Sequence, residues 1–132
     1  MLLVDTNVLV DVIQDDPRWA DWSMRQLRVQ SALHELAINP VVYAEISLSY
    51  SSLESLEKVV TAMKLAVREI PRPALFLAGK AFAQYRKRGG SKTQVLPDFF
   101  IGAHAAIEGW PLLTRDASRF RTYFPGLKVL AP

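Results

Sequence analysis

Residues 1–11, MLLVDTNVLVD, decide the fold class of this chain. Four apolar residues lead directly into Asp5, Thr6 and Asn7, and apolar positions then recur with helical spacing. A short apolar run followed by polar residues and a helix is typical of a buried parallel strand that feeds a helix. We therefore expect Asp5 at the carboxyl end of a central strand, the edge of an open α/β sheet where ligands bind. The alternative is that Asp5 only caps the helix.

The rest of the chain alternates short apolar strands with amphipathic helices. We expect four further strands, at residues 36–38, 67–70, 112–114 and 127–130. After the opening helix, the helices are expected at about residues 17–33, 40–50, 52–66, 71–88, 97–108 and 116–124. This alternation predicts a three-layer α/β/α fold whose central, mostly parallel sheet has about four or five strands. With 132 residues and no evident linker, residues 1–132 are expected to form a single domain.

Composition restricts both the compartment and the chemistry. No apolar run approaches the roughly 20 residues of a membrane span, and the amino terminus lacks the basic segment of a secretory signal, so we expect a cytoplasmic protein without a membrane partner. The chain has no cysteine, which excludes disulfides and thiolate metal sites. Carboxylates, hydroxyls and two histidines remain, and any bound metal should prefer oxygen ligands.

Four acidic residues occupy positions of interest. Asp5 and Asp116 each follow a predicted strand, and Asp98 opens the most apolar helix. Glu45 lies on the same helix face as the apolar residues Val41 and Leu48. Taken singly, Asp98 and Asp116 are better explained by a structural role at a helix amino end, Asp98 as a favourable negative charge and Asp116 as an N-cap. A carboxylate on an apolar face is harder to explain, because burying it without a partner costs several kcal/mol. If the four converge, their repulsion calls for a divalent cation, and oxygen ligands suit Mg²⁺ or Mn²⁺.

A metal site of this kind can hydrolyse a phosphodiester, and neighbouring residues fit that role. Thr6, Asn7 and Thr114 are placed to hydrogen-bond the carboxylates or the waters on a metal. Candidate contacts to a nucleic-acid backbone are the basic residues Arg86, Lys87, Arg88, Lys92 and Arg115. The first four of these also fit a solvated loop that only aids solubility. His104, on the apolar helix, is expected to be a packed core histidine rather than a general base.

Four stretches together resemble the PIN domain family, and more closely its VapC-type toxins of type II toxin–antitoxin systems. They are MLLVDTNVLVD at residues 1–11, NPVVYAEI at 39–46, GGSKTQVLPDFFIGAHA at 89–105 and LLTRDASRF at 112–120. The resemblance implies a three-layer α/β fold and a Mg²⁺- or Mn²⁺-dependent endoribonuclease that cleaves RNA. It further implies a homodimer and a cognate antitoxin protein as partner.

The resemblance also implies roles for particular residues. Asp5, Glu45, Asp98 and Asp116 match the catalytic, metal-binding acids of the family, and Thr6, Asn7 and Thr114 match the polar residues beside them. Some relatives carry a further acid a few residues after the position of Asp116. Here those positions hold Ala117, Ser118 and Arg119.

The function expected from these observations is an endoribonuclease toxin. One alternative is a PIN-fold nuclease that processes RNA without an antitoxin. The other is a non-catalytic PIN module that binds RNA or protein. The presence of all four acids argues against the binding module, because a scaffold has no need of a repulsive cluster.

Overall fold

A five-stranded sheet forms the centre of the computed structural model, which describes residues 1–132. The strands are β1 (Leu2–Val4), β2 (Leu36–Ile38), β3 (Ala66–Val67), β4 (Leu112–Leu113) and β5 (Val129–Leu130). Their order is β3-β2-β1-β4-β5, and every neighbouring pair is parallel. The register pairs Leu3 of β1 with Ala37 on one side and with Leu112 on the other. The predicted parallel α/β sheet is therefore confirmed, with β1 at its centre.

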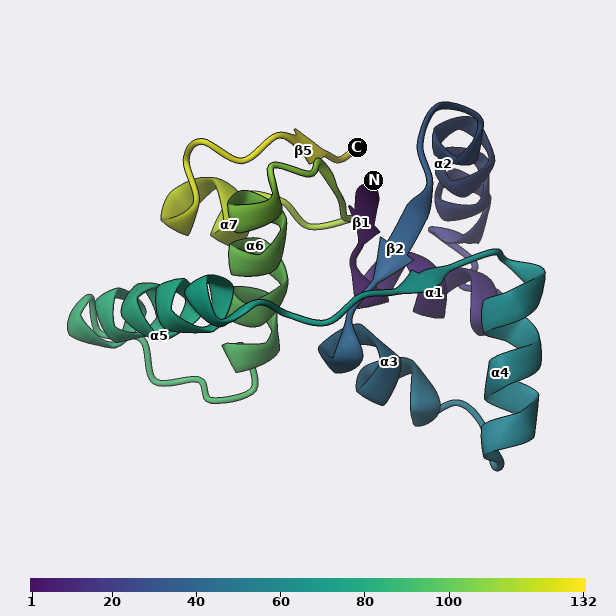
Figure 1. Cartoon of the computed structure of the whole chain (residues 1–132), viewed down its shortest axis with the longest axis horizontal. Helices are drawn as coiled ribbons and strands as arrows, with labels where there is room; N and C mark the ends of the chain where they lie inside the picture. The colour runs from purple at the N-terminus through teal and green to yellow at the C-terminus, as the bar shows by residue number, and fades with distance from the viewer.

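Seven helices cover this sheet. They are α1 (Thr6–Ile13), α2 (Ala20–Leu33), α3 (Pro40–Ser47), α4 (Leu53–Ala62), α5 (Arg72–Lys87), α6 (Leu96–Glu108) and α7 (Ser118–Tyr123). Figure 1 shows α5, α6 and α7 on one side of the sheet and α1, α2 and α4 on the other. Helix α3 lies at the carboxyl edge of the sheet and contacts both α1 and α6. The predicted three-layer fold is confirmed. None of these helices combines the length and the apolar character needed to cross a membrane.

The strand order explains where a site can form. From β1 the chain adds β2 and then β3 on one side, and it later adds β4 and β5 on the other. The connections thus change direction between β1 and β4, and such a switch point leaves a crevice at the carboxyl ends of the two strands. The three residues of β1 have no exposed surface, so the strand holds this edge firmly in the core.

Several elements are shorter than predicted: α3 ends at Ser47 instead of about residue 50, α4 ends at Ala62 instead of about residue 66, and β5 begins at Val129 instead of residue 127. The structure shows the cause of two further differences. Helix α2 begins at Ala20 instead of Pro17, because the Asp16 carboxylate accepts the backbone N–H groups of Arg18 and Trp19 and holds a separate turn before the helix. Strand β3 begins at Ala66 instead of Val67 and is shorter than predicted. Lys64 adopts a left-handed conformation with φ 54° just after α4, which returns the chain to the sheet at once.

Candidate functional site

Asp5 occupies the position predicted for it, directly after the central strand. It is 4% exposed and it is also the N-cap of α1, because its Oδ1 accepts the backbone N–H of Thr6 at 2.7 Å. Its other oxygen accepts a hydrogen bond of 2.8 Å from the hydroxyl of Thr114, which follows β4 and is fully buried. The hydrogen bond between Asp5 and Thr114 therefore joins the ends of β1 and β4 at the switch point. Asp5 both caps α1 and lines the crevice, so the two interpretations of this residue are compatible.

Glu45 reaches this edge from α3. Its Oε1 accepts a hydrogen bond of 2.6 Å from the Thr6 hydroxyl, and the residue is half-buried. The prediction that Glu45 shares a buried face with Leu48 is wrong, because Leu48 is 89% exposed. The buried positions of α3 are Val42 and Ile46. Glu45 lies beside the buried face, so that its carboxylate extends toward Thr6 while staying in contact with solvent.

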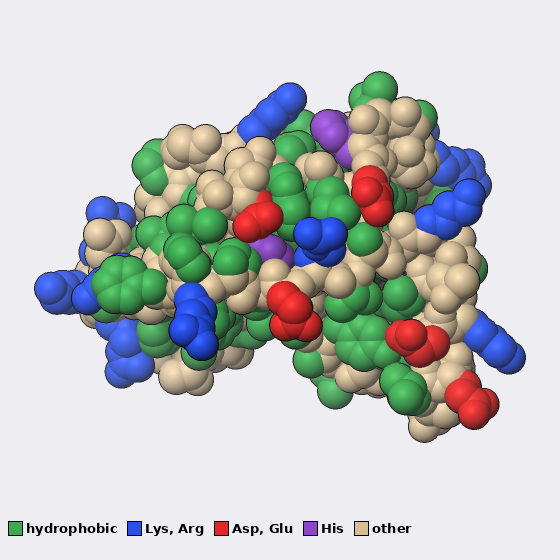
Figure 2. All heavy atoms as spheres, viewed as in Figure 1, with side chains coloured by type: hydrophobic (Ala, Val, Ile, Leu, Met, Phe, Trp, Pro, Cys, Tyr) green, Lys and Arg blue, Asp and Glu red, His purple; other side chains and the backbone are tan.

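Asp98 lies in the first turn of α6, and its Oδ2 accepts a hydrogen bond of 2.7 Å from Nη1 of Arg119. The two side chains are 32% and 29% exposed, so the ion pair is accessible to solvent on one side. In Figure 1 the starts of α3 and α6 face each other beyond the ends of β1 and β2. Figure 2 shows a hollow in the molecular surface between the part of the molecule that contains α5 and α6 and the part that contains α3 and α4.

Asp116 lies on the loop between β4 and α7 and is exposed. Its backbone N–H donates to the Thr114 hydroxyl at 3.1 Å, and its carboxylate accepts the N–H of Ser118 at 3.4 Å. Asn7 braces the same loop, because its Oδ1 accepts the backbone N–H of Arg115 at 3.1 Å and its amide nitrogen donates to Thr114 at 3.3 Å. The three polar residues predicted beside the acids thus connect β1, α1, α3 and the loop after β4.

The acids influence one another electrostatically. Burial, with a smaller contribution from the negative charges of Asp98 and Glu45, raises the pKa of Asp5 from 3.8 to about 7 against the lowering effect of its hydrogen bonds. Burial also raises the pKa of Asp98, opposed by Arg119 and reinforced by the charge of Asp116. The four acids therefore form one electrostatic cluster at the switch point: the pKa values of Asp5 and Asp98 are raised, and the charges of Glu45, Asp98 and Asp116 contribute to raising them.

The four carboxylates do not converge into a finished coordination shell. No three acidic or histidine side chains stand close enough together to hold one ion, because Glu45 is turned to Thr6 and Asp98 to Arg119. The donor set nevertheless fits a hard divalent cation, since carboxylate oxygens line this edge with hydroxyl groups between them. A cation would also stabilise the ionised form of Asp5, which burial and the negative charges of Asp98 and Glu45 disfavour.

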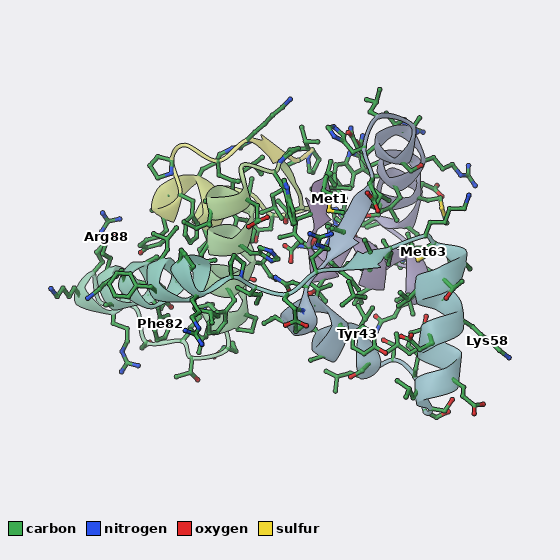
Figure 3. The ribbon with its side chains drawn as sticks, viewed as in Figure 1. Met1, Tyr43, Lys58, Met63, Phe82 and Arg88 are labelled. Atoms are coloured by element: carbon green, nitrogen blue, oxygen red, sulfur yellow. The ribbon has the colours of Figure 1, made fainter.

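The predicted basic residues fall into two places. The Arg115 side chain pairs with none of the four candidate acids and instead forms a bidentate ion pair with the buried Asp11, with Nε–Oδ2 2.9 Å and Nη2–Oδ1 3.0 Å. The role of Arg115 in binding RNA stays a prediction, because its guanidinium is bound to Asp11 in the structure. Arg86 and Lys87 lie in the last turn of α5, and Arg88 follows them. Figure 3 shows Arg88 at the outer end of this helix, remote from Met1 and the strand β1.

Two residues of this region were not singled out from the sequence. Asp11 is an acid among the apolar positions of α1, and its burial at 2% exposure requires the partners that it has in Arg115 and the Ser23 hydroxyl. An acid among apolar helix positions could have indicated from the sequence that Asp11 needs a buried partner. Arg119 was noted as one of several basic residues near the end of the chain and as a position near which some relatives carry an acid, and no local sequence pattern indicates its pairing with Asp98.

His104 is packed in the core as predicted. It has no exposed surface, and its Nδ1 accepts a hydrogen bond of 3.2 Å from the amide of Asn39, whose Oδ1 accepts the N–H of Val42. Burial lowers the pKa of His104, so the neutral ring is favoured. His104 thus supports the N-cap of α3, the helix that carries Glu45.

The fold and this edge define a class of α/β proteins in which acids from several elements gather beyond the carboxyl ends of parallel strands. The PIN domain family matches residues 2–124, and the chain belongs to that family. The resemblance inferred from the four sequence stretches is confirmed at this level. A search of curated proteins found no match.

Several solved structures that resemble this chain are of VapBC complexes. A chain of VapBC2 from Rickettsia felis, crystallised with a promoter DNA fragment, is 20% identical with a TM-score of 0.75, covering 99% of this chain and 98% of that one. A chain of DNA-bound VapBC from Salmonella typhimurium is 21% identical with a TM-score of 0.72 over 98% and 96%. A chain of VapBC-1 from nontypeable Haemophilus influenzae is 16% identical with a TM-score of 0.74 over 98% and 96%. At these identities the likeness establishes the fold.

Proposed function

We propose that this protein is an endoribonuclease that hydrolyses RNA phosphodiester bonds with Mg²⁺ or Mn²⁺ and serves as the toxin of a toxin–antitoxin pair. The observation that carries the proposal is the position of Asp5. A buried carboxylate with a pKa near 7, surrounded by further acids at the switch point of a PIN-family sheet, is the arrangement a divalent cation stabilises. The toxin role is supported by the VapBC complexes among the structural neighbours.

In this proposal Asp5, Glu45, Asp98 and Asp116 hold the cation. When bound, the ion supplies a Lewis acid that activates water and stabilises negative charge on the phosphate. The Thr114 hydroxyl keeps Asp5 oriented, and the Thr6 hydroxyl keeps Glu45 oriented. Asn7 holds the backbone at Arg115 and thereby the loop that carries Asp116.

The substrate is bound by positive charge outside the acidic site. Arg86, Lys87, Arg88 and Lys92 lie at the end of α5 and in the loop that returns to α6, where they can contact phosphates of the same strand at a distance from the cut. RNA is a flexible polyanion, so one strand can contact the acidic site at the cleaved phosphate and the basic residues at other phosphates. The antitoxin and a second copy of the chain are the proposed protein partners.

The test is cleavage of total cellular RNA, with the new 5′ ends mapped, in Mn²⁺ and in chelator. Asp98→Asn should lower cleavage by at least about a hundredfold, because it removes a charge that acts on the reacting phosphate through the metal. Asp21→Asn is the matched control, since Asp21 is also an acid in the first turn of a helix but lies exposed on α2. Full activity of Asp98→Asn, or cleavage that persists in chelator, would refute the proposal.

The toxin role has a separate test. Expression of the wild type should arrest growth, and co-expression of the protein encoded beside it should restore growth and give a complex in gel filtration. Cleavage of RNA without growth arrest would favour the RNA-processing nuclease. A protein that binds RNA but neither cuts it nor binds Mn²⁺ would be a binding module.

A further inference from the structure

Arg119 places a positive charge inside the acidic cluster. It lies in α7, and its guanidinium donates to Asp98 at 2.7 Å, one of only two ion pairs in the molecule. The other pair, between Arg115 and Asp11, includes none of the four candidate ligands. Arg119 is therefore the one cation of the chain that is paired with a proposed metal ligand.

Aromatic packing holds this guanidinium in place. Its central carbon lies 5.9 Å from the ring centroid of Tyr85, and Tyr85 packs against Phe82 at 5.9 Å and Phe99 at 5.6 Å. Phe99 is fully buried and is the residue next to Asp98. A stacked guanidinium keeps its edge free to donate to oxygens. The arginine is thus oriented toward the acids by the core, unlike a mobile surface side chain.

The charge balance of the cluster depends on Arg119. Four ionised carboxylates would be balanced by two divalent cations, whereas a guanidinium already balances one carboxylate, so that a single divalent cation nearly neutralises the rest. One divalent ion leaves the four carboxylates and Arg119 with a formal net charge of about −1, and a second divalent ion would reverse it to about +1. The guanidinium occupies Oδ2 of Asp98 and leaves Oδ1 for one ion, so a second ion at this carboxylate would have to displace Arg119.

We propose that Arg119 replaces one of two cations in this site, so that the protein binds one divalent ion firmly and uses the guanidinium to contact the phosphate being cleaved. The inference rests on the proposed nuclease function and specifies how its site is charged. A guanidinium suits this role because it donates to phosphate oxygens in a fixed fork, and because it keeps its charge at every physiological pH.

The test measures Mn²⁺ binding by calorimetry, with the number of bound ions checked by electron paramagnetic resonance. Wild type should bind one ion. Arg119→Gln should bind a second ion at least about tenfold more tightly than wild type does, because the competing charge-assisted bond to Asp98 is gone. Arg119→Lys, which keeps the charge, should bind one ion. Arg121→Gln is the matched control, because Arg121 is exposed on the same helix and forms no ion pair.

RNA cleavage provides a second readout, in which Arg119→Gln should lose activity although it binds more Mn²⁺. At saturating Mn²⁺, Arg119→Gln should lower kcat by about tenfold or more through loss of the phosphate contact, and Arg119→Lys should restore part of it. Two equivalent ions in wild type, or the same Mn²⁺ binding in wild type and Arg119→Gln, would overturn this inference and leave the nuclease proposal standing. No Mn²⁺ binding by any of the four proteins would overturn both.

Discussion

Replacing Asp5 by asparagine should stabilise the metal-free protein at pH 8 while it abolishes RNA cleavage. The pKa of Asp5 is raised from 3.8 to about 7, so keeping this carboxylate ionised in the folded state costs on the order of 4 kcal/mol. Asparagine removes the charge and caps a helix about as well as aspartate, so the bond from Thr6 N–H can be kept. The polar contact with Thr114 can also remain, with the amide as donor.

The sign of the pH dependence follows from the direction of that pKa change. Between about pH 4 and pH 7 the folded protein retains the Asp5 proton that the unfolded chain has released, so stability falls as pH rises through this window and levels off above it. From pH 5 to pH 8 the wild type should therefore lose on the order of 3 kcal/mol more than Asp5→Asn. The contribution of His104 is common to both proteins and cancels in the difference.

The assay is urea denaturation in chelator at pH 5, 6, 7 and 8. The difference between the two midpoints should widen by about 1 to 2 M urea from the lowest to the highest pH. Added Mn²⁺ should stabilise the wild type at pH 8 and leave Asp5→Asn unchanged, because only a ligand that binds the folded state shifts the equilibrium. Asp116→Asn is the control for an exposed acid of the same site. Parallel pH profiles of wild type and Asp5→Asn would refute the electrostatic account.

Three further experiments test the packing and the charge distribution. Arg115→Ala should destabilise the protein by about 3 to 5 kcal/mol in urea denaturation because it leaves Asp11 buried without its cation, and adding Asp11→Ala should recover part of that loss. Gly102→Ala should lower the melting temperature, since a Cβ there would lie 2.5 Å from the ring of Phe124, whereas Gly79→Ala, with open space around it in α5, should raise it slightly. Glutamine at the three consecutive basic residues ending α5 should reduce the salt dependence of single-stranded RNA binding, measured by fluorescence anisotropy, by about two in the log–log slope. An unchanged slope would exclude that end of α5 from the RNA path.

Much of the fold is predictable because its signals are local. The apolar run before Asp5 specifies a buried strand, and the helices between the strands carry their own boundaries, such as the Asn39 cap, Pro40 and the left-handed Gly109. The marginal β3 was placed less accurately because its two residues carry little periodic pattern and their position depends on where α4 ends. The exposure of Leu48 could not be predicted, since an apolar residue at a helix end is buried only if another element covers it.

The sequence by itself determined the parallel sheet, the order of the acids along the chain and the position of Asp5 at a strand end, because each depends on residues that are neighbours in the chain. Only the tertiary structure decided which charges meet. Arg119 and Asp98 are 21 residues apart, and Arg115 and Asp11 are 104 apart. Their pairing follows from how α1, α6 and α7 pack around the sheet. An ion pair of this kind requires two side chains to approach within hydrogen-bond distance, and no local periodicity encodes that approach.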